Sequence, residues 1–236
     1  MTQAHGDQYL LFPEDRYISV ASAIRARASF KSNLWLFDSP KNNKRAIIEG
    51  DVAFIHTVLL EGNTSVANYD INPPPVIAEI DGEVRQTTLD TIVYFRDGRE
   101  EWVEYKRSED TGPSRKGRAV PQLNAQAQAA ARAGKTYNTR TEKDLLGKEL
   151  LFDNWLHLCG SITRARRYST YTEERTIKSM LDLHGEIPVS ALFDSPNCDP
   201  GLMNAALAKY LQQGLIDVDL VNKLLTHGTV IRWRST

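Results

Sequence analysis

The order of the expected elements predicts an α/β protein, in which a mixed β-sheet is flanked by helices and a smaller helical unit follows at the C-terminus. Three observations support this class: hairpin signals in the middle of the chain, Ala- and Gln-rich helix-forming sequence after them, and a late run of short helices and strands. We expect an N-terminal arm over residues 1–40, an α/β core over 41–160, a linker over 161–171 and a C-terminal unit over 172–236.

Composition is that of an ordinary globular protein. The chain has 236 residues, 41% hydrophobic and 25% charged, which is enough for one large or two small cores. Its formal charge of −1 provides no overall basic field, so any DNA contact must come from local patches or from a partner. Cys159 and Cys198 lie far apart without metal-ligand spacing. With no leader-type or membrane-length apolar run, we expect a cytoplasmic protein without membrane association.

The first helix of the core is expected over residues 44–60. Its apolar positions recur at helical spacing and are Ile48, Val52, Ile55 and Leu59. Glu49 lies at the edge of this stripe, where a carboxylate can face a cleft, and Glu61 falls on the solvent side. His56, on the flank of the stripe, is expected to be a packed, hydrogen-bonded histidine rather than a ligand.

The candidate chemistry lies on a hairpin with strands over 90–95 and 101–106, joined by an Asp-Gly turn. Because side chains alternate along a strand, Glu104 and Lys106 leave the sheet on the same side, and Asp90 opens the neighbouring strand. Carboxylates are hard oxygen ligands for Mg²⁺, and Lys106 would orient a water or stabilise charge on a phosphate. The alternative is a surface Glu-x-Lys pair on an ordinary hairpin.

The hairpin is framed by further expected elements. A strand over 66–71 and a hairpin over 76–87 precede it, and a helix over 122–133, a strand over 136–140 and a capped helix from Thr141 to about Leu158 follow. Gln126 can face the site, although helix propensity also explains it. A polar loop lies between the hairpin and the helix expected over 122–133. It either binds a phosphate backbone or is an ordinary loop, and its basic residues are Arg107, Arg115, Lys116 and Arg118.

The C-terminal unit has the order of a winged helix. A Thr170-x-x-Glu173 capping box begins its first helix, two more helices follow, and two late strands form a small wing. Its third helix, over 202–213, contains Lys209 but no arginine, which is weak for a reader of the DNA major groove. A protein partner is therefore favoured over DNA.

Taken in order, Glu49, Asp90, Glu104 and Lys106 match the PD-(D/E)xK nuclease motif. The surrounding sequence is more specific: between residues 44 and 106 the chain resembles the TnsA-type endonuclease subunit of heteromeric transposases. The matching segments are Ile48-Glu-Gly-Asp51 with Phe54, Val66-x-x-Tyr69-x-x-x-Pro73, Thr88-Leu-Asp90, Asp97-Gly98 and Val103-Glu-Tyr-Lys106.

This resemblance implies a restriction-endonuclease-like fold and a Mg²⁺-dependent endonuclease, with Mn²⁺ as a possible substitute, that cuts the 5′ ends of a mobile element. A TnsB-like DDE transposase would cut the 3′ ends, and a TnsC-like AAA+ ATPase would contact the C-terminal domain. Asp90, Glu104 and Glu49 would hold the metal, and Lys106 would assist the attacking water.

Two positions depart from the family pattern. Leu89 replaces the usual proline before Asp90, and Asn72 replaces a frequent glutamine, with no assignable role. Two other functions stay open at this stage. One is a stand-alone PD-(D/E)xK nuclease in restriction, phage or repair pathways, and the other is a non-catalytic winged-helix adaptor.

Overall fold

The computed structural model describes residues 32–80, 83–111 and 119–235, so most of the expected N-terminal arm lies outside the described residues. The elements follow in chain order as β1 (Leu34–Ser39), β2 (Lys44–Glu49), α2 (Asp51–Gly62), β3 (Val66–Ile71), β4 (Val76–Ile80), β5 (Glu83–Thr87), β6 (Thr91–Phe95), β7 (Glu100–Tyr105), η2 (Ser108–Asp110), α3 (Ala119–Arg132), β8 (Thr136–Arg140), η3 (Glu142–Leu145), α4 (Glu149–Ala165), α5 (Tyr171–His184), β9 (Glu186–Pro188), α6 (Val189–Phe193), α7 (Pro200–Gln213), β10 (Ile216–Asp217) and β11 (Val230–Trp233). Within these residues, no helix has the length and apolar character needed to span a bilayer.

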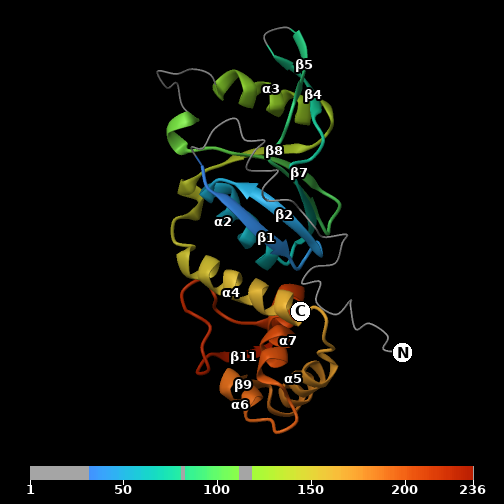
Figure 1. Cartoon of the computed structure of the whole chain (residues 1–236), viewed down its shortest axis with the longest axis vertical. Coiled ribbons are helices and arrows are strands. Elements are labelled where there is room, and N and C mark those ends of the chain that lie inside the picture. The colour runs from blue at the N-terminus through green and yellow to red at the C-terminus, as the bar shows by residue number, and fades with distance from the viewer. Residues whose placement is uncertain (1–31, 81–82, 112–118, 236) are drawn as a thin grey trace, which may run out of the picture.

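A mixed four-stranded sheet lies at the centre of the α/β part (Figure 1). Its strands are ordered β3, β6, β7, β8; all neighbours are antiparallel except β7 and β8, which are parallel and are joined through α3. The turn between β6 and β7 contains Gly98 at a φ of 86°, and the N–H of Phe95 donates to the carbonyl oxygen of Arg99 at 2.9 Å. The predicted α/β class and the central hairpin are confirmed.

The two faces of this sheet are covered by different helices. On one face, Ala129 of α3 and Trp102 of β7 belong to one cluster of packed apolar side chains. On the other face, Leu60 of α2 packs with Val103. Because consecutive strand residues point to opposite faces, Glu104 shares the face of Trp102 and lies under α3.

The helix expected over residues 44–60 is wrong in its first part. Residues Lys44–Glu49 form β2, which pairs antiparallel with β1, and α2 begins at Asp51. Gly50 separates them with a φ of 92°, a value outside the right-handed helical region, and its N–H donates to the carbonyl oxygen of Asn33 at 2.9 Å. Pairing with β1 thus outweighs the helical spacing of the apolar residues, and Gly50 ends the strand instead of lying inside a helix.

The buried side of α2 also differs from the expected stripe. Its buried residues are Phe54, Thr57, Val58 and Glu61. Glu61, which was expected on the solvent side, is fully buried because hydrogen-bond donors from β1 and β3 surround its carboxylate. His56 is packed as predicted: its ring stacks on Tyr105, and Nε2 lies 3.2 Å from the carbonyl oxygen of Thr141.

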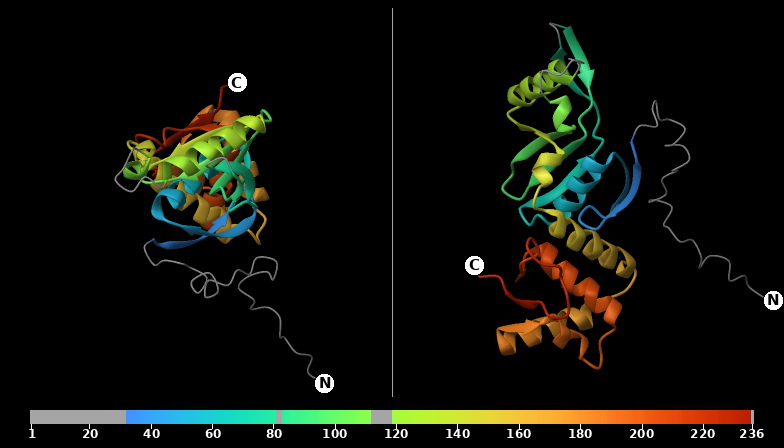
Figure 2. Two further views of the ribbon diagram at one scale, coloured as in Figure 1. Left: turned by 90° about the horizontal axis from the view of Figure 1, so that it is seen from above. Right: turned by 90° about the vertical axis from the view of Figure 1, so that its left-hand side faces the viewer.

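Helix α4 lies between the sheet-containing part and the C-terminal helices (Figure 2). The predicted N-cap at Thr141 is present and forms a capping box with Asp144, but it caps the short η3, and α4 starts separately at Glu149. The expected helix end near Leu158 is also wrong, because α4 continues through Gly160 to Ala165. One apolar cluster joins Val58 of α2, Leu158 of α4 and Leu207 of α7, so tertiary packing extends the helix into the expected linker.

The C-terminal unit has three helices and a three-stranded sheet ordered β10, β11, β9, with both pairs antiparallel. The short β9 was not predicted. The capping box at Thr170 is wrong: the Thr170 hydroxyl donates to Glu174 and accepts from Nζ of Lys209 at 2.6 Å. Glu173 is buried and accepts the N–H of Asp199 at 3.2 Å. Contacts with α7 and its N-cap therefore replace the local cap.

Candidate active site

The register of β6 and β7 brings two of the predicted acids together. Thr91 pairs with Val103, so continuing the ladder by one residue puts Asp90 opposite Glu104. The N–H of Tyr105 donates to Oδ2 of Asp90 at 2.7 Å, which fastens the carboxylate to the end of β7. The sequence prediction that Asp90 lies within reach of the Glu-x-Lys pair is confirmed.

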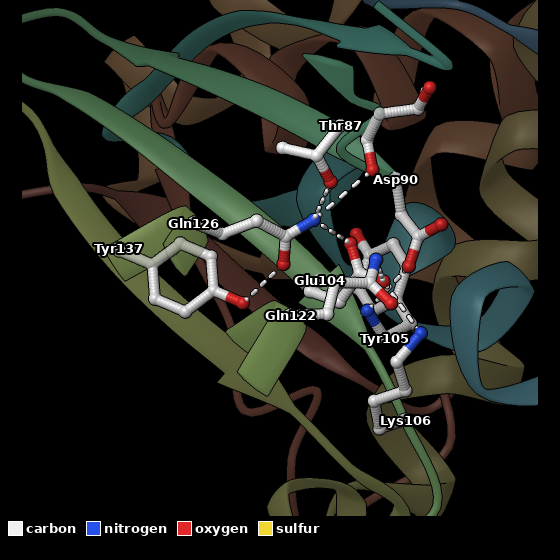
Figure 3. Close-up of polar contacts among 9 residues, drawn as sticks. Thr87, Asp90, Glu104, Tyr105, Lys106, Gln122, Gln126 and Tyr137 are labelled. Atoms are coloured by element: carbon white, nitrogen blue, oxygen red, sulfur yellow. Dashed lines mark hydrogen bonds and ion pairs between the residues drawn. The ribbon is translucent and has the colours of Figure 1, made fainter. Parts of the chain in front are cut away.

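Glu104 is almost fully buried and is held by cationic and amide groups (Figure 3). Nζ of Lys106 donates to Oε1 at 2.6 Å, as expected for two side chains on one side of a strand. Nε2 of Gln122 lies 3.5 Å from the same oxygen, and Nε2 of Gln126 donates to Oε2 at 3.2 Å. Both carboxylate oxygens of Glu104 therefore face hydrogen-bond donors.

Asp90 is in a different electrostatic environment. Burial raises the pKa of its carboxyl from 3.8 to about 6, and the negative charges of Glu104 and Glu49 act in the same direction. The Tyr105 N–H and the Lys106 ammonium partly oppose this rise in pKa. Like charges crowded around a desolvated carboxyl are an arrangement that a cation would relieve.

Glu49 was expected to reach the site from a helix, but it lies at the end of the strand β2. It is exposed, and its Oε1 accepts from the Ser32 hydroxyl at 2.6 Å. Glu49, Asp90 and Lys106 line one pocket of about 560 Å³. The remaining lining residues are Ser32, Asn33, Gly50, Asp51, Val52, Ala53, Tyr105 and Arg107.

The carboxylates of Glu49, Asp90 and Glu104 are suitable ligands for a divalent cation, but they are not spaced as a complete metal site. Among the residues that the structure describes, no three His, Cys, Asp or Glu side chains approach closely enough to form a ready-made metal site. Asp90, Glu104 and Glu49 nevertheless supply hard carboxylate oxygens, the ligand type that Mg²⁺ and Mn²⁺ take. After burial, the negative charges of Glu104 and Glu49 also raise the pKa of Asp90, so the three acids interact electrostatically at one place, where a cation would offset their charge.

The predicted DNA-contacting loop is described only in part. Arg107 lines the pocket, and its side chain is 72% exposed. Its Nη1 lies 3.9 Å from Glu109, in a contact that is too exposed to hold the side chain firmly. The other three basic candidates, Arg115, Lys116 and Arg118, lie outside the described residues.

Two side chains near the site carried little or no signal in the sequence. Gln126 faces Glu104, which its position in a helix-forming run allowed but did not require. Tyr137 of β8 donates to Oε1 of Gln126 at 2.8 Å, and nothing in its strand sequence indicated this. To predict the contact between Tyr137 and Gln126, one would first have to know that β8 pairs with β7.

Comparisons with known proteins give no identity. No protein-family model matches the chain, and no curated protein matches its sequence.

Proposed function

We propose that the chain is a metal-dependent DNA endonuclease whose active site consists of Asp90, Glu104, Lys106 and Glu49. The observation that carries the proposal is the convergence of Glu49, Asp90 and Lys106 on one pocket, with Glu104 paired to Lys106 behind it. Hydrolysis of a phosphodiester needs an oriented water and compensation of negative charge, and these groups supply both kinds of contact.

In this proposal Asp90, Glu104 and Glu49 hold Mg²⁺, or Mn²⁺ as a substitute. The bound ion would supply Lewis acidity and lower the pKa of a water. Lys106 has 26% of its side chain exposed, so its ammonium can contact a phosphate oxygen while it remains paired with Glu104. Arg107, exposed at the mouth of the pocket, would hold the adjacent phosphate.

For the C-terminal unit we propose a winged-helix-like module that binds a protein partner. The order of three helices and a small antiparallel sheet supports this. Its third helix, α7, is an unsuitable DNA reader because much of its surface is buried. Lys209, its lone basic residue, is engaged by Thr170 and by Glu174 at 3.4 Å.

The more particular proposal follows from the TnsA-type resemblance over residues 44–106. The chain would hydrolyse the 5′ ends of a mobile element together with a TnsB-like DDE transposase and a TnsC-like AAA+ ATPase. A net charge of −1 supports such a division of labour, because a partner would supply most of the DNA affinity.

The test is cleavage of supercoiled plasmid in Mg²⁺ or Mn²⁺, first with the isolated protein and then together with a TnsB-like DDE transposase and a TnsC-like AAA+ ATPase. We expect Asp90→Ala and Lys106→Ala to abolish cleavage, while the exposed controls Asp153→Ala and Lys143→Ala leave it unchanged. Cleavage only in the complete mixture would support the transposition proposal, and cleavage by the isolated protein would favour a stand-alone nuclease. Full transposition with Asp90→Ala would overturn the nuclease proposal in favour of an adaptor.

A further inference from the structure

Gln126 is a polar side chain buried completely between α3 and the sheet. Its Nε2 atom lies 3.2 Å from each of three acceptors, which are Oγ1 of Thr87, the carbonyl oxygen of Thr88 and Oε2 of Glu104 (Figure 3). A buried amide without partners is costly, so these contacts decide where the side chain lies.

Tyr137 sets which way the Gln126 amide points. The Tyr137 hydroxyl donates to Oε1 of Gln126 at 2.8 Å, and this leaves the NH₂ group to face the strands. Burial raises the pKa of Tyr137 to about 12, so the hydroxyl keeps its proton at neutral pH. The donor role of Gln126 toward Glu104 therefore depends on a residue of β8.

The same amide also reaches the backbone that leads into Asp90. Thr88, whose carbonyl oxygen accepts from Gln126, is two residues before Asp90 in the chain. Gln126 has two N–H bonds and three acceptors, so Glu104 and the Thr87–Thr88 segment share its donors. One side chain thus ties together the segments that carry Asp90 and Glu104.

Glu104 needs such a support. Oε1 is drawn toward Lys106, and Gln126 holds Oε2 from the other side. Without Gln126, Lys106 and Gln122 would still hold Oε1, but Oε2 would lose this donor, and the terminal torsion of glutamate is broad enough for the carboxylate to shift. Groups that hold a ligating carboxylate fix its orientation and typically change metal affinity by about 10- to 100-fold when they are removed.

We propose that Gln126 and Tyr137 are a pair of positioning residues that orient Glu104 and the segment before Asp90 for binding a divalent cation. The inference rests on the proposed nuclease function. The pair touches neither substrate nor metal, and Tyr137 acts only through the amide of Gln126.

Calorimetric titration of the full-length protein with Mn²⁺ alone, and then with Mg²⁺ alone, tests the pair. We expect Gln126→Leu to weaken binding by about 10- to 100-fold, and Tyr137→Phe to weaken it by a smaller factor. In the double variant, Tyr137→Phe should add nothing to Gln126→Leu, because the hydroxyl acts through the amide. Gln128→Leu, an exposed glutamine on the same helix, is the matched control.

Thermal unfolding of each variant separates positioning from general stability. If Gln126→Leu fails to fold, Tyr137→Phe still tests the inference, because it removes a single oxygen atom. One outcome would overturn the inference and leave the nuclease proposal standing. In it, the wild type binds metal, Asp90→Ala does not, and Gln126→Leu and Tyr137→Phe bind metal as tightly as Gln128→Leu. A wild-type protein that binds neither ion, or binds it equally well after Asp90→Ala, would overturn the inference, and the cleavage assay in the complete mixture would then decide the nuclease proposal separately.

Discussion

The N–H of Asn72 donates to the carbonyl oxygen of Asp90 at 2.9 Å, while Asn72 itself has a φ of 52°. This left-handed residue lets the chain turn at the end of β3 and fasten the backbone of Asp90, an acid of the proposed active site. It also gives a structural role to one of the two positions where the sequence departs from the TnsA-type pattern.

We therefore expect Asn72→Gly to be nearly neutral and Asn72→Val to lower the free energy of unfolding by about 1–2 kcal/mol. Asparagine and glycine tolerate a positive φ, whereas a β-branched residue does not. Urea denaturation of the two variants provides the measurement. Equal stability of the two would show that the left-handed conformation is not required at residue 72.

A second prediction concerns the charge on Asp90. Its pKa is about 6 in the folded protein, against 3.8 as the ordinary value, so the folded state binds more protons between pH 4 and 6. Stability is therefore lost as the pH rises through this window, by at most on the order of 2–3 kcal/mol. Above pH 6 the ionised carboxylate opposes folding.

Asp90→Asn should consequently abolish cleavage and yet stabilise the metal-free protein at pH 7.5. An asparagine oxygen can still accept the Tyr105 N–H, while the buried charge is gone. The gain, measured by urea denaturation in a chelating buffer, should shrink toward zero at pH 4. A gain that stays constant over this range would mean that Asp90 does not titrate as described.

Local sequence patterns were sufficient for part of this architecture. The strands β3 to β8 follow from β-branched and aromatic runs with turn residues between them, and the pairing of Glu104 with Lys106 follows from strand alternation alone. Such features depend on residues that are close together in the chain. The Asp90–Glu104 juxtaposition needed one further assumption, that the hairpin closes in register.

The errors lie where strand pairing and tertiary packing decide. The 44–49 segment is a strand because the preceding strand β1 pairs with it across a short turn, and Glu61 is buried because β1 and β3 surround it. The support of Glu104 by Tyr137 requires the parallel β7–β8 pairing and the α3 crossover together. No periodic pattern in the local sequence predicts any of these contacts.

Gly62 gives a third prediction, at the contact between α2 and α4. A Cβ atom on this residue would overlap the indole ring of Trp155, whose side chain is itself buried. We expect Gly62→Ala to lower the free energy of unfolding by about 1–3 kcal/mol, as overpacking usually does. Gly160→Ala is the matched control: the atoms nearest to its Cβ would belong to the flexible Arg164 side chain, and alanine favours a helix over glycine. An unchanged melting temperature in Gly62→Ala would contradict this packing.

The buried carboxylate of Glu61 gives the last prediction. It accepts from the hydroxyls of Ser39 and Tyr69, and from Nε2 of Gln212 in α7 at 2.9 Å, so it links the sheet-containing part to the C-terminal unit. Burial raises the pKa of Glu61, while the hydroxyls of Ser39 and Tyr69 and the backbone N–H and charge of Lys41 partly oppose this rise.

Removal of the Tyr69 hydroxyl would leave that carboxylate short of a buried donor without creating a large cavity. We therefore expect Tyr69→Phe to lower the free energy of unfolding by about 1–3 kcal/mol. Tyr94→Phe on the neighbouring β6 is the control, because its hydroxyl bonds the partly exposed Asp70 at 3.3 Å and should contribute less. Chemical denaturation measures the free energy of unfolding of both variants. An equal loss in both would mean that the buried hydrogen bond to Glu61 stabilises the protein no more than the partly exposed one to Asp70.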